Sequence, residues 1–417
     1  MAHTVLGSVS LGYQLMWNPL RQLRGVQLFV GIDETTPVDS QHFLSAMAEL
    51  WSEQAPSLLL SIQSTRLLVD ILNNAPTDTP WIEVHESHLR DPAMAQRVHK
   101  AHQRGMKLIW RGDVGARPSA ALAPCFLRTM VSLTAEEALA GLRVSLRKQN
   151  GADPTQASRV TSPVLAGQIY EAVASRALSE HCLDEQGAWA VAGWPMEEVL
   201  LGYRYQRIQP GHRAIVRLVE AIDADHSVER IDHLLSEEPI LAYRFMRYAN
   251  SAGLGLGLSI ESIHHGLLVL GVSLLRAWLL EQLPHATSDL NLQPVRTAMV
   301  LRAQLMAQLL DAGVSEDLRR DIYLCGLFSQ IDLMLGEPLA PALARVPLSE
   351  RINSAILKRT GVYMPYLDVA TALELPHTHA TRALCDAHKL DVEAVNQALL
   401  RTLSHVRQYP AKGLLLL

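Results

Sequence analysis

Short apolar runs alternate with amphipathic stretches along the first half of the chain. The apolar runs, each typical of a buried strand, are VQLFVGI (26–32), LLLSIQ (58–63), WIEV (81–84) and MKLIW (106–110). Stretches with the helical period lie between them at 42–53 and 92–105, and Gly105 stands in the usual position at a helix end. Strands that alternate with helices predict a parallel sheet wrapped by helices, and a β/α barrel is one such fold.

The second half of the chain follows the helical period almost throughout. Pro239 suits a first helical turn, and after it Leu241, Phe245, Tyr248 and Ala249 recur at the spacing of one buried helix face. Further helices are predicted over 294–312, 317–335, 348–358, 365–374 and 391–408. Because the sequence shows no alternating strand pattern after about residue 205, this half is predicted to be all-helical.

The boundary between the two patterns falls in GYRYQRIQPGHR (202–213), where Pro210-Gly211 marks a loop before the next helix. A chain of 417 residues is also too long for one ordinary domain. We therefore expect a β/α domain over 1–202 and an all-helical domain over 203–408.

Composition and charge restrict the classes of function. Apolar residues form 48% of the chain and charged residues 19%, which fits globular cores and excludes a disordered protein. The net charge is −5 and the pI is about 6.4, without a lysine- or arginine-rich tract. Nucleic acid is therefore not favoured as a partner.

The sequence predicts neither secretion nor membrane insertion. The N-terminal MAHTVLGSVSLGYQLMW lacks the basic segment and continuous apolar stretch of a signal peptide. The longest apolar run, from Leu267 to Leu275, is interrupted by Gly271 and Ser273, whereas a membrane span needs about 20 predominantly apolar residues. The four cysteines are scattered and form no Cys-x-x-Cys pair, which fits a reducing compartment. These features predict a cytoplasmic protein.

The stretch IDHLLSEEPILAYRFMRYANSAGLGLGLSIESIHHGLLVLGVSLLRAWLL (231–280) resembles the HDOD domain. The shared features are a helix that ends in Asn250-Ser251-Ala252, a glycine-containing loop, Ser262-Ile263, and Leu270-Gly271 between two apolar helices. The resemblance covers roughly 205–400 and implies an all-helical relative of the HD phosphohydrolases, found in bacterial signalling proteins and lacking their metal ligands. We interpret Asn250, Ser251 and Gly271 as structural, the first two as a helix cap and turn.

The residues at the HD position agree with this loss of metal ligands. An HD enzyme places adjacent His and Asp near a helix start, because imidazole and carboxylate together hold a divalent metal pair. This chain has Gly326-Leu327-Phe328-Ser329-Gln330 at that place. Neither Ser329 nor Gln330 supplies such a ligand, and one nearby carboxylate, Asp332, does not make a site.

Fragments of the first half resemble the EAL cyclic di-GMP phosphodiesterase domain, which precedes HDOD in a recognised group of proteins. These fragments are GYQLMWN (12–18), LLLSIQ (58–63), WIEVHES (81–87), LIWRGDVGA (108–116) and VAGWPMEEVL (191–200). The resemblance implies a TIM-type β/α barrel. Active members hold two metal ions, chiefly with carboxylates at the strand ends.

Several residues that the resemblance implies for that site are replaced. Gln14 stands where the metal-binding glutamate is expected, and Asn18 stands near an arginine that would contact phosphate. Ser61 replaces a ligand asparagine, and Gly112 replaces the first of two aspartates. Three carboxylates are retained: Glu83, Glu86 and Asp113. We interpret these three as leftover polar residues at strand ends, and the domain as degenerate.

We hypothesise that the chain is a non-catalytic bacterial signal-transduction protein that binds a protein partner and uses no cofactor or metal. A first alternative is a sensor that binds cyclic di-GMP or another nucleotide through the retained carboxylates without hydrolysing it. A second alternative is a residual metal-dependent phosphodiesterase, which predicts turnover that Glu83→Ala abolishes.

Overall fold

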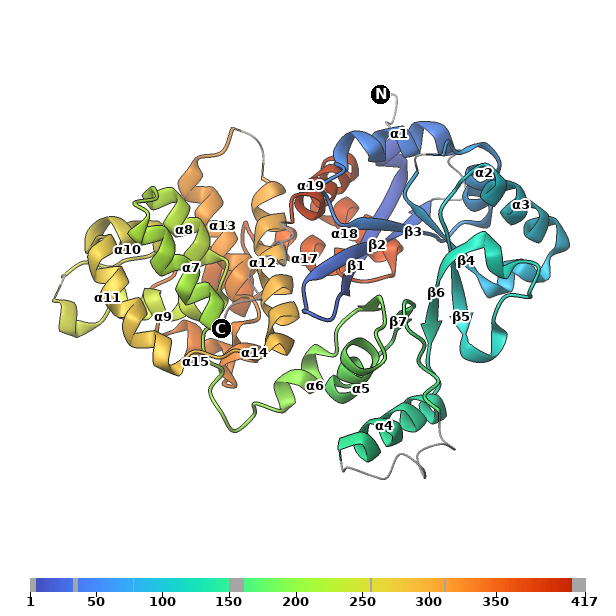
Figure 1. The fold of residues 1–417 in the computed structure, drawn as a ribbon. Helices are drawn as coiled ribbons and strands as arrows, with labels where there is room; N and C mark the ends of the chain where they lie inside the picture. The colour runs from blue at the N-terminus through green and yellow to red at the C-terminus, as the bar shows by residue number, and fades with distance from the viewer. Residues whose placement is uncertain are drawn as a thin grey trace. The chain divides into compact units, whose positions relative to one another are not determined.

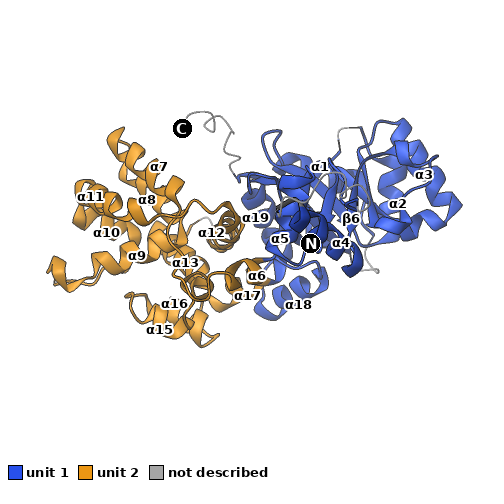
Figure 2. Ribbon diagram, turned by 60° about the horizontal axis from the view of Figure 1, so that its bottom comes forward, with its two compact units in different colours: residues 1–195, 372–417 blue, residues 196–371 orange. Residues whose placement is uncertain are grey.

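The computed structural model (Figure 1) describes residues 5–32, 37–77, 79–149, 161–255, 257–310 and 313–406. The chain divides into two compact units, shown in Figure 2. Unit 1 comprises residues 1–195 and 372–417, and unit 2 comprises residues 196–371. This division differs from the expected domains 1–202 and 203–408, because the chain after residue 371 packs with the first unit.

Unit 1 is built around a closed barrel in which each strand pairs with the next and β8 pairs with β1. Its strands are β1 (Val9–Trp17), β2 (Leu23–Ile32), β3 (Ser57–Ile62), β4 (Trp81–His85), β5 (Leu108–Asp113), β6 (Phe126–Ser132), β7 (Ile169–Glu171) and β8 (Ala190–Ala192). The predicted barrel followed by a helical region is confirmed. Strands β2 to β8 run parallel, but β1 is antiparallel to both of its neighbours, unlike the first strand of a uniformly parallel TIM barrel.

Helices follow the strands on the outside of the barrel. They are α1 (Ser40–Leu50), α2 (Thr65–Asn74), α3 (Pro92–Gln103), α4 (Ala135–Gln149) and α5 (Arg176–Glu180), with shorter turns at η1 (Val5–Ser8), η2 (Glu86–Arg90), η3 (Val114–Ala116), η4 (Ala123–Cys125) and η6 (His181–Glu185). The first three helices begin at side chains that accept a hydrogen bond from a free backbone N–H: Asp39, Ser64 and Asp91. Local sequence therefore sets where these helices start.

The inside of the barrel is layered. Alternate residues of each strand point inward, and an apolar layer is formed by Met16, Leu59, Ile109, Met130, Ile169, Ala190 and Ala192. The residues two positions nearer the carboxyl ends of the parallel strands include Ser61, Arg111, Ser132 and Glu171. These positions are polar, so a polar layer lies on an apolar floor.

Two helices from the end of the chain complete unit 1. They are α18 (Thr378–His388) and α19 (Val392–Ser404), and α19 lies beside α1 (Figure 1). Arg382 of α18 donates to the Ser10 hydroxyl at 3.0 Å and to the carbonyl of Val9 at 3.2 Å. The Asn396 amide of α19 donates to the carbonyls of Leu6 and Val9 at 2.8 and 2.9 Å. The sequence predicted a helix over 391–408 but placed it in the helical domain.

The chain that enters α18 covers the carboxyl ends of β2 and β3. The Gln63 amide, just after β3, donates to the Pro376 carbonyl at 2.7 Å and accepts from the Thr378 hydroxyl at 2.8 Å. A Cβ at Gly12 would lie 2.3 Å from the Leu375 carbonyl oxygen. The backbone of β1 and the backbone of residue 375 therefore pack directly against each other. Residues 373–382 therefore lie at the barrel end where β/α enzymes bind their substrates.

Unit 2 is helical throughout its described residues. Its helices are α6 (Met196–Leu201), α7 (His212–Asp223), α8 (Val228–Ser236), α9 (Pro239–Ala249), α10 (Ile263–Leu270), α11 (Val272–Gln282), α12 (Gln293–Gln308), α13 (Glu316–Phe328), α14 (Ile331–Leu335), α15 (Leu339–Leu343), α16 (Glu350–Leu357) and α17 (Met364–Leu373), the last of which ends just past the boundary. The helix predicted over 317–335 is divided at Ser329-Gln330 into α13 and α14.

A buried ion pair joins three parts of unit 2. The Arg296 Nε of α12 lies 2.8 Å from the Glu238 carboxylate, and the two side chains are 6% and 2% exposed. Glu238 also accepts from the backbone N–H of Gly211 at 3.0 Å and of Leu241 at 2.6 Å. The same carboxylate thus caps α9 and fixes the loop before α7 against α12.

Among the described residues, no single helix has the length and apolar character of a membrane span. In the ranges that the structure describes, α10 taken together with the run from Val272 to His285 passes that test by length and composition, but the chain bends by 109° between the two parts.

Replacing Gly12 by alanine tests the docking of residues 373–382. Without a neighbour, alanine would be the better strand residue, but here its Cβ collides with the Leu375 carbonyl and the backbone has to move. We expect the free energy of unfolding of the full chain in urea to fall by about 1–3 kcal/mol. Gly115→Ala is the control, because no heavy atom lies within 4 Å of that Cβ position. Equal stability of the two variants would contradict the docking.

Candidate functional site

The polar layer begins with a hydrogen-bonded group on β2, β3 and β4. Gln27 is fully buried, and its amide donates to the Ser61 hydroxyl at 2.9 Å and to the Glu83 carboxylate at 3.0 Å. The Ser61 hydroxyl donates to the same carboxylate oxygen of Glu83. Gln27 and Ser61 together satisfy one oxygen of the Glu83 carboxylate, whose residue is only 8% exposed.

An arginine holds the other side of this carboxylate and joins it to a second one. Arg111 of β5 donates from Nη1 to Glu83 at 3.2 Å and from Nε to Glu171 of β7 at 2.8 Å. Ser132 of β6 donates to the same oxygen of Glu171 at 2.8 Å. Arg111 therefore lies between two buried carboxylates that come from strands on either side of it.

The two carboxylates raise the pKa of Arg111, so its guanidinium stays protonated. Burial lowers the pKa of the guanidinium, but the charges of Glu83 and Glu171 and the hydrogen bonds to them raise it more, and the net shift is upward. The cluster thus contains two carboxylates and one permanent cation. A divalent ion in the same space would have to compete with a guanidinium that cannot lose its proton.

The structure brings two of the predicted site residues together and places a third beside them. Ser61 and Glu83 are hydrogen-bonded partners in the polar layer. Gln14 lies on the antiparallel β1, directly opposite Gln27, so the two share one face of the strand pair. The Gln14 amide packs against Gly193, where a Cβ would be 2.5 Å away.

The other predicted positions in the barrel lie outside this cluster. Asn18 is in the turn between β1 and β2, where its carboxamide oxygen accepts from the Gln22 N–H at 3.0 Å. That turn is at the amino-terminal end of the parallel strands, opposite the polar layer. Glu86 begins η2 and pairs with Arg90 at 3.8 Å. Asp113 is exposed at the end of β5.

Sequence reasoning missed Gln27, Arg111 and Glu171. The alternation of the strands contains the signal for two of them. Gln27 interrupts the apolar run VQLFVGI, and Arg111 follows MKLIW at the inward period of two. Glu171 ends a strand of only three residues, which is too short for a pattern to identify.

The structure places the HDOD motif residues at the end of α9, at the start of the loop that follows it, and between α10 and α11. Asn250 ends α9, and its amide donates to the carbonyls of Met246 at 2.8 Å and of Ile260 at 2.9 Å. Its carboxamide oxygen accepts from the Ile260 N–H at 2.9 Å, so Asn250 closes the glycine-containing loop. Ser251 begins that loop and is exposed. Gly271 separates α10 from α11 with a φ of 76°, which favours glycine.

The HD position holds a helix end. Ser329 caps α13: its hydroxyl donates to the Gly326 carbonyl at 2.8 Å and accepts from Arg302 at 3.1 Å. Gln330 lies between α13 and α14. Within the part of the chain that the structure describes, no group of three or more His, Cys, Asp or Glu side chains could hold a metal ion.

The cysteines are also unsuited to chemistry. All four are free and buried. Burial raises the pKa of the Cys182 and Cys325 thiols to about 12, so neither forms the reactive thiolate near neutral pH.

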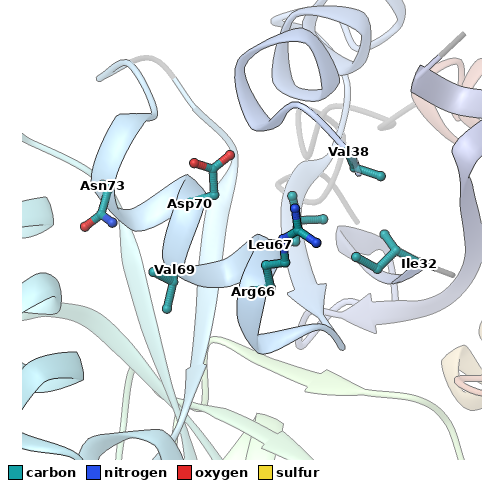
Figure 3. A pocket seen from close by; sticks show the side chains of 7 residues that line it. All are labelled: Ile32, Val38, Arg66, Leu67, Val69, Asp70 and Asn73. Carbon is teal, nitrogen blue, oxygen red and sulfur yellow. The ribbon is translucent and has the colours of Figure 1, made fainter. Parts of the chain in front are cut away.

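A hollow of about 350 Å³ lies on unit 1 beside α2, separate from the polar layer. Figure 3 shows its lining residues, Ile32, Val38, Arg66, Leu67, Val69, Asp70 and Asn73. Asp70 is engaged by the Asn74 amide at 2.7 Å and by the Ser40 N–H at 3.4 Å. Its described lining residues include one cation, Arg66, and one anion, Asp70.

The architecture defines a barrel unit with a charge-compensated polar layer and a separate helical unit. Residues 210–344 of the helical unit match the HDOD domain, so the chain carries an HDOD domain. The chain is 22% identical over 194 residues to the cyclic di-GMP phosphodiesterase CdgJ of Vibrio cholerae. The aligned stretch covers 46% of this chain and 45% of CdgJ. It is also 22% identical over 181 residues to the uncharacterized protein YuxH of Bacillus subtilis. That alignment covers 42% of this chain and 43% of YuxH. The matched stretch is thus less than half of each curated relative.

Two solved structures show a distant likeness. The MmoQ response regulator of Methylococcus capsulatus is 15% identical with a TM-score of 0.37, covering 46% of this chain and 98% of that protein. The Klebsiella pneumoniae protein BlrP1, solved with manganese and cyclic di-GMP, is 13% identical with a TM-score of 0.29, covering 45% of this chain and 55% of BlrP1.

Removing the cation from the polar layer tests its role. Arg111→Met leaves Glu83 and Glu171 buried without a positive partner, and we expect a loss of about 2–4 kcal/mol in the free energy of unfolding. Adding Glu83→Gln and Glu171→Gln to this variant should restore most of the loss, because no uncompensated charge then remains. Arg90→Met is the control, because its side chain is 81% exposed. A loss no larger than that of the control would contradict a compensating role for Arg111.

Alanine substitutions of the neighbouring motif residues Asn250 and Ser251 should have very different effects on the free energy of unfolding. Asn250→Ala removes three hydrogen bonds, one within α9 and two that close the loop after it, and we expect a loss of about 1–3 kcal/mol in the free energy of unfolding, measured in denaturant. Ser251→Ala should change stability by less than about 0.5 kcal/mol, because Ser251 is exposed. Similar effects of both changes would refute the structural reading of Asn250.

Proposed function

We propose that this chain is a signal-transduction protein of the bacterial cytoplasm that acts by binding a protein partner and catalyses no reaction. The observation that carries the proposal is Arg111, whose guanidinium lies between Glu83 and Glu171 at 3.2 and 2.8 Å. The cation needed to balance these buried carboxylates is supplied by the chain itself.

The residues of the barrel do not fit a two-metal hydrolase. Such a site needs several oxygen ligands around a pair of divalent ions, and the ions supply most of the transition-state stabilisation. The polar layer offers two carboxylates, both held by hydrogen bonds to Gln27, Ser61, Arg111 or Ser132. Glu86 and Asp113, the other retained carboxylates, lie outside the layer.

The helical unit supports the same conclusion. Its Ser329 and Gln330 form the end of α13 and have no imidazole or carboxylate to bind a metal. The HDOD match and the similarity to CdgJ, which is named a cyclic di-GMP phosphodiesterase, support a role in second-messenger signalling. A protein that keeps the two folds without their metal ligands can still transmit a signal through its surfaces.

The alternative of a nucleotide sensor in the barrel finds less support. Phosphate recognition there would need a free cation, but Arg111 is committed to two carboxylates. Residues 373–382 also cover part of the barrel end where a substrate would enter.

A hydrolysis assay tests the absence of catalysis. The full chain is incubated with cyclic di-GMP and either Mg²⁺ or Mn²⁺, with CdgJ as the active control. We expect product no greater than in the protein-free blank, and no heat on titration of Mn²⁺ into the protein. Metal-dependent turnover that Glu83→Ala abolishes would overturn the proposal. Failure to recover any stoichiometric protein partner under several conditions would count against the binding role.

A further inference from the structure

The helical unit contains a cleft of about 660 Å³ that includes neither the HD position nor any residue of the barrel. Four side chains of α9 form one wall: Tyr243, Arg244, Arg247 and Tyr248. The other walls come from residues 207–208, from α11 and from the chain between 334 and 345. A cleft of this size lies in the range of about 300–1,000 Å³ that is typical of small-molecule sites.

The cleft is strongly positive in a chain whose net charge is −5. Four arginines line it, Arg207, Arg244, Arg247 and Arg345. The single lining carboxylate, Glu337, is engaged by both Nη atoms of Arg345 at 2.7 and 2.8 Å. The remaining three guanidinium groups therefore face the cleft without a lining anion to balance them.

These three arginines are held close together. Among the described side chains, neither Arg207 nor Arg247 has a carboxylate within 4.0 Å. Arg244 is half-buried and donates to the Gln282 carboxamide at 3.3 Å and to the Ile208 carbonyl at 3.4 Å. Burial lowers the pKa of Arg244; the charge of Glu238 opposes this shift, and the charges of Arg207 and Arg247 add to it. An anion in the cleft would relieve this repulsion.

An aromatic surface borders the same space. Tyr248 and Trp278 are stacked, with ring centroids 5.5 Å apart and planes 20° apart. Phe245 packs edge-on against Trp278, with the two ring centroids 5.8 Å apart, and helps to hold the indole in place. A planar ring that enters the cleft can stack on these aromatic side chains, as nucleic-acid bases do on protein rings.

We propose that this cleft binds a nucleotide, with the phosphate held by Arg207 and Arg247 and the base against Tyr248. Guanidinium groups match phosphate oxygens in two-point hydrogen bonds, and the stacked rings supply the base contact that a bare anion would not use. Ser251, from the HDOD motif, is exposed and lines the cleft, so its hydroxyl is placed to bond the phosphate or sugar. The site belongs to the helical unit and is independent of the polar layer in the barrel.

Calorimetry on the full chain tests the proposal with AMP, GMP, ATP, cyclic di-GMP and, as a base-free anion, inorganic pyrophosphate. We expect at least one nucleotide to bind with a Kd below about 1 mM and more tightly than pyrophosphate. Arg247→Ser should weaken that binding at least tenfold, about 1.4 kcal/mol, and should leave the melting temperature nearly unchanged because Arg247 is exposed. Tyr248→Leu should reduce the preference for the nucleotide over pyrophosphate.

The matched control is Arg276→Ser, which removes a positive charge from α11 outside the cleft, where Arg276 pairs with Asp223 at 2.6 Å. It should alter the Kd less than twofold. The proposal is overturned if no nucleotide binds, or if Arg247→Ser binds as tightly as the unchanged chain, which would place the ligand elsewhere. It is equally overturned if pyrophosphate binds as tightly as every nucleotide, which would reduce the cleft to a patch for any anion.

Discussion

Two carboxylates that are both ionised and buried near each other in a barrel need a positive charge between them, and this constraint organises the first half of the molecule. Arg111 supplies that charge and contacts both Glu83 and Glu171. Around this guanidinium, Gln27, Ser61 and Ser132 donate hydrogen bonds to the two carboxylates, while the Gln27 Oε1 atom is buried without a hydrogen-bond partner among the described residues. The interior at this level is therefore held by ion pairs between strands that are distant in the sequence.

The barrel also depends on a part of the chain that is distant in sequence. The polypeptide leaves unit 1 after residue 195, forms the helical unit, and returns at residue 372 to add α18 and α19. Arg382 and Asn396 satisfy backbone carbonyls around β1, and the absence of a side chain at Gly12 lets the returning chain approach closely. In sequence, the helical unit is therefore an insertion in the barrel unit. The barrel unit is complete only after the chain has passed through the helical unit.

In the helical unit, buried polar groups fix the elements around an open cationic cleft. The Glu238–Arg296 pair sets α9 against α12, and Asn250 closes the loop that follows α9. With α9 fixed at both ends, Arg244, Arg247 and Tyr248 present a rigid charged and aromatic wall. The two units share one feature: in each, a buried carboxylate is paired with an arginine, Glu83 with Arg111 and Glu238 with Arg296.

The sequence alone predicted the four strands β2 to β5, the helices α1 and α3, and the HDOD region, because these follow from local periodicity and short motifs. It also identified Ser61 and Glu83, which lie at inward positions of regular strands. It did not place Arg111 against Glu171, since those residues are 60 positions apart and meet only when the barrel closes. Nor did it place α18 and α19, whose helical period is the same whether they pack in one unit or the other. Pairing across the barrel and docking of the returning chain depend on long-range geometry, and only the tertiary structure decides them.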